Sequence, residues 1–112
     1  MKQGELLWIQ FPYSNLTESK VRPAVIVSND SYNQQNQDIV VCAITSNLKE
    51  TPYSLPLENH SLTQGQLTVQ SRIRADKILQ INKQLALKSF GRINDKTYDR
   101  LIAKIKTLVE RK

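Results

Sequence analysis

The chain has 112 residues, a length that suits a single domain spanning residues 1–112 and leaves little room for a second. Its apolar fraction of 39% and charged fraction of 23% are those of a globular protein and argue against extensive disorder. The 16 Lys and Arg residues outnumber the 10 Asp and Glu residues, and the net charge of +6 favours an anionic partner such as nucleic acid, an acidic protein or a membrane surface.

The N-terminal half of the chain predicts three strands joined by polar loops. Apolar and aromatic residues dominate positions 5–11, a β-branched run occupies 21–28, and the most apolar segment is 38–44. The segments between them, 12–20 and 29–37, are rich in polar residues, so we expect a loop or turn in each.

The C-terminal half predicts shorter strands. Residues 52–57 contain two prolines and suit an edge strand, followed by a polar loop that runs through Gly65. Residues 66–71 alternate apolar and polar side chains as a half-exposed strand does, and 76–81 suit another short strand. Gly91 predicts a turn before the last element.

The last element is expected to be an amphipathic helix. Asn94 suits its N-cap and Asp95 its first turn. One apolar stripe recurs at helical spacing and consists of Tyr98, Leu101, Ile102, Ile105, Leu108 and Val109. Five or six short strands followed by such a helix predict a mainly β protein, a small barrel or strongly bent sheet with the helix packed on it.

Cysteine and histidine are too few for metal or disulfide chemistry. Cys42 lies in an apolar run and His60 in a polar loop, and each is the only residue of its type. We therefore predict no internal disulfide, no metal site and no cofactor. The N-terminus lacks a basic segment followed by an apolar one, and no apolar stretch is long enough to span a bilayer. These features predict a cytoplasmic protein with no membrane partner.

Four sequence segments, in order, resemble a known family. They are GELLWIQF at 4–11, KVRPAVIVSND at 20–30, IVVCAITSN at 39–47 and QSRIRADKI at 70–78. Together they are similar to the MazF/PemK toxins of bacterial type II toxin–antitoxin systems. The resemblance covers nearly the whole chain and weakens in its C-terminal third. RPAVIVSN and AITSN are its most specific parts, because they carry polar residues that a plain strand does not need.

The resemblance implies a fold, an activity and partners. The fold would be a small Src-homology-like β-barrel of the MazF/CcdB type with a C-terminal helix, working as a homodimer. The activity would be sequence-selective, metal-independent cleavage of single-stranded RNA, often mRNA. A cognate acidic antitoxin protein would restrain the toxin by covering its RNA groove.

The resemblance also implies catalytic residues. Arg22 of RPAVIVSN matches the family's active-site arginine, and Thr45 of AITSN matches its catalytic threonine, with Ser46 beside it. Asp76 is the natural match for an aspartate in the later segment. The match is imperfect there, because Gln70 stands where many members have an acidic residue. The functional histidine that some members carry in the first loop is absent from this sequence.

Several further residues are candidates for RNA binding. Arg72 and Arg74 are two apart and would share one face of a strand, and with Lys77 they form the best local basic patch for an RNA backbone. Which of the two arginines faces RNA stays open. Tyr13 and Tyr53 lie beside prolines in predicted loops and suit base stacking. Trp8 and Phe11, in contrast, suit core or dimer packing.

The implied reaction assigns a role to each catalytic residue. The RNA 2′-hydroxyl attacks the adjacent phosphorus and expels the 5′-oxygen, leaving a 2′,3′-cyclic phosphate and a 5′-hydroxyl. Arg22 suits the stabilisation of phosphoryl charge and is a poor base, because guanidinium stays protonated. Thr45 would donate a hydrogen bond or position the 2′-hydroxyl. Asp76 would act as a base or orient an arginine.

Two other classes of function stay open on sequence grounds. One is a CcdB-like, non-enzymatic inhibitor of DNA gyrase with the same fold. The other is an inactive module that binds RNA or antitoxin without turnover. Arg22 together with Thr45 favours the ribonuclease, and the C-terminal KTLVERK has no distinctive signature of a gyrase binder.

Overall fold

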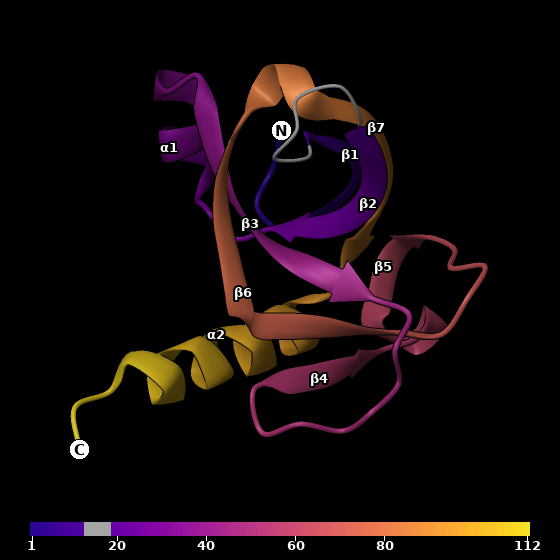
Figure 1. Ribbon diagram of the computed structural model, residues 1–112, viewed down its shortest axis with the longest axis vertical. Coiled ribbons are helices and arrows are strands. Elements are labelled where there is room, and N and C mark those ends of the chain that lie inside the picture. The colour runs from indigo at the N-terminus through magenta and orange to yellow at the C-terminus, as the bar shows by residue number, and fades with distance from the viewer. Residues whose placement is uncertain (13–18) are drawn as a thin grey trace.

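Seven antiparallel strands form one curled sheet in the computed structural model, which describes residues 1–12 and 19–112 (Figure 1). The strand order is β4-β6-β3-β2-β1-β7-β5. The strands are β1 (Glu5–Pro12), β2 (Ser19–Ile26), β3 (Asp38–Thr45), β4 (Ser54–Leu57), β5 (Leu62–Gly65), β6 (Ser71–Asn82) and β7 (Ala86–Ile93). The helices are α1 (Asp30–Gln35) and α2 (Asp95–Val109), with short 3₁₀ turns η1 (Asn59–Ser61) and η2 (Lys83–Leu85). The prediction of a mainly β fold with a bent sheet and a C-terminal helix is confirmed.

The central strands are apolar on both faces because the curled sheet has a core on each side. On β2, Ala24 and Ile26 contribute to one core and Val25 to the other, and all three are fully buried. The first core, between the sheet and α2, is built from Leu6, Val25, Cys42, Ile44, Leu55, Leu57, Ile73, Ala75, Ile93 and Leu101. The second core contains Leu7, Ile9, Ala24, Ile26, Ile39, Val41 and Ile81. Two-sided burial explains why 21–28 and 38–44 are runs of apolar residues rather than alternating patterns.

The helix α2 begins at the predicted cap and packs on β6 and β4 (Figure 1). The Asn94 side chain accepts a hydrogen bond from the Thr97 backbone N–H at 2.8 Å, which satisfies one of the free donors of the first turn. Leu101 is fully buried in the first core. The Tyr98 hydroxyl donates to the Val27 carbonyl at 2.9 Å and ties the helix to the end of β2. Neither α-helix of the described chain combines the length and the apolar content needed to cross a bilayer.

The strand β6 bends sharply in its first half (Figure 1). Cys42 pairs with Ile78 and Ile44 pairs with Ile73, so two steps along β3 match five steps along β6. The extra residues of β6 leave the β3 ladder, while its first part pairs on the other side with the edge strand β4. This bend carries Arg74 and Asp76, two of the predicted site residues.

Several sequence predictions about elements differ from the structure. Segment 29–37 contains α1, whose Asn29 cap accepts from the Tyr32 N–H at 2.8 Å. Within the predicted polar loop before residue 66, residues 62–65 form β5, whereas the predicted strand 66–71 is irregular until Ser71. The predicted strand 76–81 is confirmed, but it is only part of the twelve-residue β6.

Gly91 lies inside β7 rather than in the predicted turn. A Cβ at Gly91 would lie 2.7 Å from the Gln64 carbonyl oxygen of β5, so the glycine is needed for close approach of two strands. Of the predicted loop 12–20, residues 13–18 lie outside the described residues.

Candidate functional site

A groove with a volume of about 810 Å³ is lined by residues of β1, β2, β3, β6 and β7 and by residues 66–69 between β5 and β6. Its charged lining residues are all basic, namely Lys20, Arg22, Arg74 and Lys77, and no acidic residue occurs among the described residues that line it. Its apolar lining residues include Trp8, Phe11, Val21, Leu67, Val69, Leu79 and Phe90. The groove therefore combines positive charge with an apolar wall.

Arg22 and Thr45 line this groove from neighbouring strands. Ala24 pairs with Ala43 in the β2–β3 ladder, and Arg22 and Thr45 each lie two residues beyond that pair, with Ser46 next along the chain. The Thr45 hydroxyl oxygen accepts from the Asn47 N–H at 3.1 Å, so its hydrogen is free to be donated. Within residues 1–12 and 19–112, the Arg22 guanidinium makes no hydrogen bond or ion pair. An unengaged guanidinium and a hydroxyl donor side by side are suited to binding a phosphate.

Arg74 and Asp76 form a bidentate ion pair at the bend of β6. The Arg74 Nε and Nη2 atoms donate to the two Asp76 carboxylate oxygens, each at 3.1 Å. The hydrogen bond from Arg74 lowers the pKa of Asp76 below its ordinary value, and the hydrogen bond to Asp76 raises the pKa of Arg74. Asp76 is therefore ionised at neutral pH and is a weak proton acceptor. Arg74 lines the groove and Asp76 does not, so the geometry suits Asp76 to orienting the arginine.

Arg72 is turned toward the edge strand β4. Its Nε donates to the Ser54 hydroxyl at 2.9 Å and its Nη2 to the Ser54 carbonyl at 3.1 Å. The structure thus brings Arg74 but not Arg72 to the groove, although the two residues are only two apart. Strand spacing predicts that Arg72 and Arg74 share a face, but their hydrogen-bond partners differ. Ser54 binds the Arg72 guanidinium and Asp76 binds the Arg74 guanidinium.

Of the remaining predicted residues, some line the groove and others do not. Lys77 lines the groove. Tyr53 does not, and its carbonyl accepts from the Ala75 N–H at 2.8 Å. Tyr13 lies outside the described residues. His60 lies on η1, where its exposed ring is 3.2 Å from a Glu58 carboxylate oxygen and does not line the groove.

Trp8, for which the sequence favoured core or dimer packing, lines the groove together with Phe90, which the sequence did not single out. Trp8 is 37% exposed although its neighbours Leu7 and Ile9 are buried. Its ring lies on that of Phe90, with centroids 5.1 Å apart and planes tilted by 33°. The alternation of β1 offered the signal, because a strand that buries Leu7 and Ile9 on one face directs Trp8 to the other.

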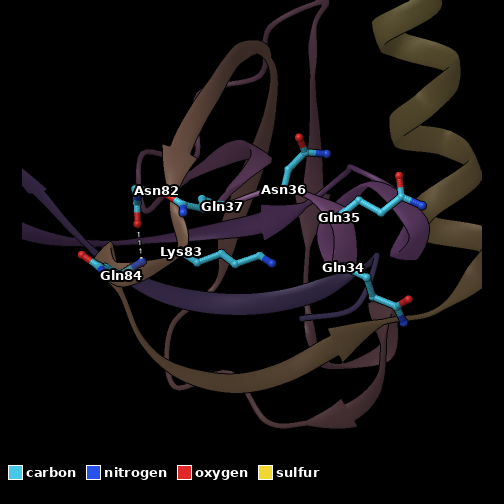
Figure 2. A pocket seen from close by; sticks show the side chains of 7 residues that line it. All are labelled: Gln34, Gln35, Asn36, Gln37, Asn82, Lys83 and Gln84. Carbon is cyan, nitrogen blue, oxygen red and sulfur yellow. Dashed lines mark hydrogen bonds between the residues drawn. The ribbon is translucent and has the colours of Figure 1, made fainter.

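A second hollow, of about 440 Å³, lies between the end of α1 and η2 (Figure 2). Six amide residues and one lysine line it, and they are Gln34, Gln35, Asn36, Gln37, Asn82, Gln84 and Lys83. The labelled side chains in Figure 2 do not converge on one point. None of the predicted site residues lines this hollow. Among the described residues, no group of three or more His, Cys, Asp and Glu side chains is placed to hold a metal ion.

Comparison with known proteins gives a family and a fold. The model of the family described as PemK-like, MazF-like toxin of type II toxin–antitoxin system matches residues 2–109. A MazE–MazF complex from Deinococcus radiodurans is similar in structure, with a TM-score of 0.83, 21% identity, and coverage of 100% of this chain and 97% of that one. No curated protein matches the chain in sequence.

Two mycobacterial structures are also similar. An endoribonuclease in complex with its cognate antitoxin from a Mycobacterial species has a TM-score of 0.75 and 17% identity, with 96% of this chain and 92% of that chain covered. The Mycobacterium tuberculosis toxin MazF-mt6 has a TM-score of 0.72 and 16% identity, with coverage of 94% and 98%. At these identities the likeness establishes the fold.

Proposed function

The chain belongs to the PemK-like, MazF-like toxin family of type II toxin–antitoxin systems, and on that premise we propose that residues 1–112 act as one toxin domain that cleaves single-stranded RNA, in particular mRNA, without a metal ion. One observation carries the proposal. Arg22 and Thr45 lie two residues beyond the same strand pair, in a groove whose charged lining is entirely basic in the described residues. A polyanion with a reactive phosphodiester fits such a groove.

The proposed reaction uses the RNA's own 2′-hydroxyl as nucleophile. The O2′–P bond forms and the P–O5′ bond breaks, which leaves a 2′,3′-cyclic phosphate and a 5′-hydroxyl. The proton lost from O2′ is balanced by the proton gained at O5′. Negative charge grows on the non-bridging phosphoryl oxygens during attack, and donors aimed at those oxygens lower the barrier.

The groove residues supply those donors. Strand β2 contributes Arg22 and Lys20 to the basic lining, and the planar guanidinium of Arg22 binds two phosphoryl oxygens. The free hydrogen of Thr45 donates to the same phosphate or to the 2′-oxygen. Arg74, held by Asp76, contacts the phosphate or its neighbour in one fixed orientation. Asp76 is thus a positioning residue rather than the base.

Residues around this centre hold the RNA strand. Lys77 and Lys20 face the groove and neutralise flanking phosphates. Ser46, next to Thr45 in the groove lining, hydrogen bonds to the sugar or base. Contacts to unstacked bases give the sequence selectivity. Arg72, Tyr53 and Tyr13 remain predictions as RNA contacts.

The proposal extends to partners. Similar solved structures include an endoribonuclease with its cognate antitoxin and a MazE–MazF complex. We propose that an acidic antitoxin segment occupies the same basic groove, and that the toxin works as a homodimer in the cytoplasm, where mRNA is found. Competition follows because both ligands bring negative charge to the same four basic side chains.

Incubation of several unrelated long single-stranded transcripts with the protein in excess EDTA tests this function. Discrete fragments are expected, with 2′,3′-cyclic phosphate ends that resist a 3′-end ligase until the cyclic phosphate is opened and the resulting monophosphate is removed. Intact transcripts throughout would refute the proposal. The next assay would then be DNA gyrase supercoiling, which a CcdB-like inhibitor would block and an inactive binding module would not.

A further inference from the structure

The aromatic pair of Trp8 and Phe90 lies beside the phosphate-binding residues of the groove. Trp8 pairs across the β1–β2 ladder with Pro23, the residue that follows Arg22. Phe90 approaches from β7 on the other side of β1, and both rings line the groove that contains Arg22 and Thr45. An aromatic surface is therefore placed one residue along β2 from the proposed phosphate site.

Trp8 stays exposed although its neighbours along β1 are buried in the core. Leu7 and Ile9, on either side of it, are 3% and 0% exposed, whereas Trp8 is 37% exposed. Phe90 packs against the first core, and its ring lies beside the indole at a centroid distance of 5.1 Å. A large ring that is held in place yet open to water is suited to covering by another flat apolar surface.

The chemistry of the groove favours one occupant for this surface. Single-stranded nucleic acid combines a chain of phosphates with flat base faces, and the groove combines four basic side chains with the two rings. A second copy of the chain docked through this same face would bring its own four basic groove residues against these, so this face does not suit pairing with itself. An acidic polypeptide matches the charge but offers a flat face only where it carries an aromatic residue.

We propose that Trp8 and Phe90 form a stacking subsite for one nucleobase next to the phosphate held by Arg22. This inference rests on the proposed function and adds a specific role in substrate binding. Stacking holds one base beside the scissile bond, while phosphate contacts alone do not distinguish one nucleotide from the next. The base at this position would therefore set the register of cleavage.

Binding of single-stranded DNA 12-mers tests the subsite directly. DNA lacks the 2′-hydroxyl and so cannot be cut by the proposed route, and an abasic strand of equal length keeps the phosphates but removes every base. Trp8 is the one tryptophan of the chain, so its emission reports on the subsite alone. Dye-labelled strands give affinities for variants that lack Trp8.

The variants separate stacking from folding. Phe90→Leu and Trp8→Leu keep apolar volume and remove a ring, Trp8→Phe restores a ring, and Tyr32→Leu removes a half-buried aromatic residue of α1 outside the groove. We expect the base-containing strand to quench Trp8 emission in the unmodified protein. Phe90→Leu and Trp8→Leu should bind that strand roughly 5- to 150-fold more weakly, the range measured for the loss of one base–aromatic stack. Abasic-strand affinity should not change, Trp8→Phe should recover most of the loss, and Tyr32→Leu should bind like the unmodified protein.

Four results would overturn the subsite. Equal losses on both strands would mean that the rings only support the fold. Unchanged affinity and emission, with RNA still cleaved in an Arg22-dependent manner, would remove the subsite and leave the ribonuclease standing. Quenching by an acidic peptide but by no strand would assign the rings to a polypeptide. Absence of strand binding together with intact RNA would refute the subsite and the ribonuclease together.

Discussion

At the scale of single residues, the surroundings of the two β6 arginines determine what each can do. Arg72 uses its Nε and Nη2 donors on Ser54, which joins β6 to the edge strand β4. Arg74 uses the same donors on Asp76, where the pair is partly exposed and lies at the groove. The positive charge of Arg74 remains available to a phosphate, whereas Arg72 contributes to the sheet edge.

The Arg74–Asp76 pair predicts a specific pH dependence. Since the pKa of Asp76 is lowered from 3.8, the stabilising contribution of the pair is fully present above that pH and is lost as the pH falls through the lower folded value. Asp76→Asn should lower kcat/KM by roughly tenfold, the effect of losing one charged hydrogen bond. The shape of the pH–rate profile should stay the same between about pH 6 and 9, because Asp76 is ionised throughout that range. Cleavage rates across this range measure both effects.

A double-variant comparison controls that prediction. Asp76→Asn should add little to the loss caused by Arg74→Ala, because the carboxylate acts through the guanidinium. A loss of roughly a hundredfold or more in Asp76→Asn alone, with a neutral-range break removed from the profile, would instead identify Asp76 as the general base.

At the scale of elements, the contact between β5 and β7 depends on two glycines that face each other. Gly65 pairs with Gly91, has a φ of +85°, and leaves room for the Phe90 carbonyl oxygen, which a Cβ at Gly65 would meet. Gly4 also has a positive φ, of +88°, but the nearest atom to a Cβ there is 3.6 Å away. A side chain at either position would be strained by the positive φ, but only at Gly65 would it also clash with a neighbouring strand.

Alanine at these two positions should therefore have unequal effects. Gly4→Ala should cost about 1–2 kcal/mol of unfolding free energy from the left-handed backbone alone. Gly65→Ala should cost at least about 3 kcal/mol, because the added methyl also forces β5 away from β7. Urea unfolding of both variants measures the difference, and equal stabilities would show that the strand contact is not tight.

The sequence predicts those strands and helices whose order of apolar and polar residues follows from burial. β1, β2, β3 and α2 were predictable because their residues face the two cores, and Asn94 was recognisable as a cap. β5 was not, because its burial pattern is mostly exposed and its place depends on pairing with β7, far along the chain. Gly91 misled for the same reason, since the need for a glycine comes from a strand partner and not from a turn.

The candidate site was partly predictable. Arg22, Thr45 and Ser46 followed from the resemblance of two segments to the MazF/PemK toxins, and all three line the groove. Arg72 and Arg74 differ in their hydrogen-bond partners, Ser54 and Asp76, and no spacing rule contains that information. The Trp8–Phe90 contact joins β1 to β7, so only the sheet order brings the rings together.

At the scale of the whole molecule, the groove gathers four of the 16 basic residues that give the chain its net charge of +6. No acidic residue occurs among the described residues that line it. Binding of a single strand should therefore release counterions and weaken as salt is added. The groove predicts how steeply the affinity falls.

Four phosphate contacts predict a slope of about −3 for the logarithm of the association constant against the logarithm of salt concentration, from about −0.7 per phosphate on a single strand. Lys77→Ala should reduce the slope by about 0.7. Lys106→Ala, on the exposed last turn of α2, is the matched control and should leave it unchanged. A slope near zero for an uncleavable strand would show that the groove does not bind the RNA backbone.

The central claim, that the groove at Arg22 is where RNA is cut, is tested most directly by single-turnover cleavage with Arg22→Ala. The control is Arg100→Ala, an exposed arginine of α2 outside the groove, and far-UV circular dichroism verifies that both variants are folded. We predict that Arg22→Ala is slower by roughly a hundredfold or more, the loss expected for one donor to the developing charge, while Arg100→Ala cleaves at the wild-type rate. A folded Arg22→Ala protein that cleaves at the wild-type rate would contradict the account.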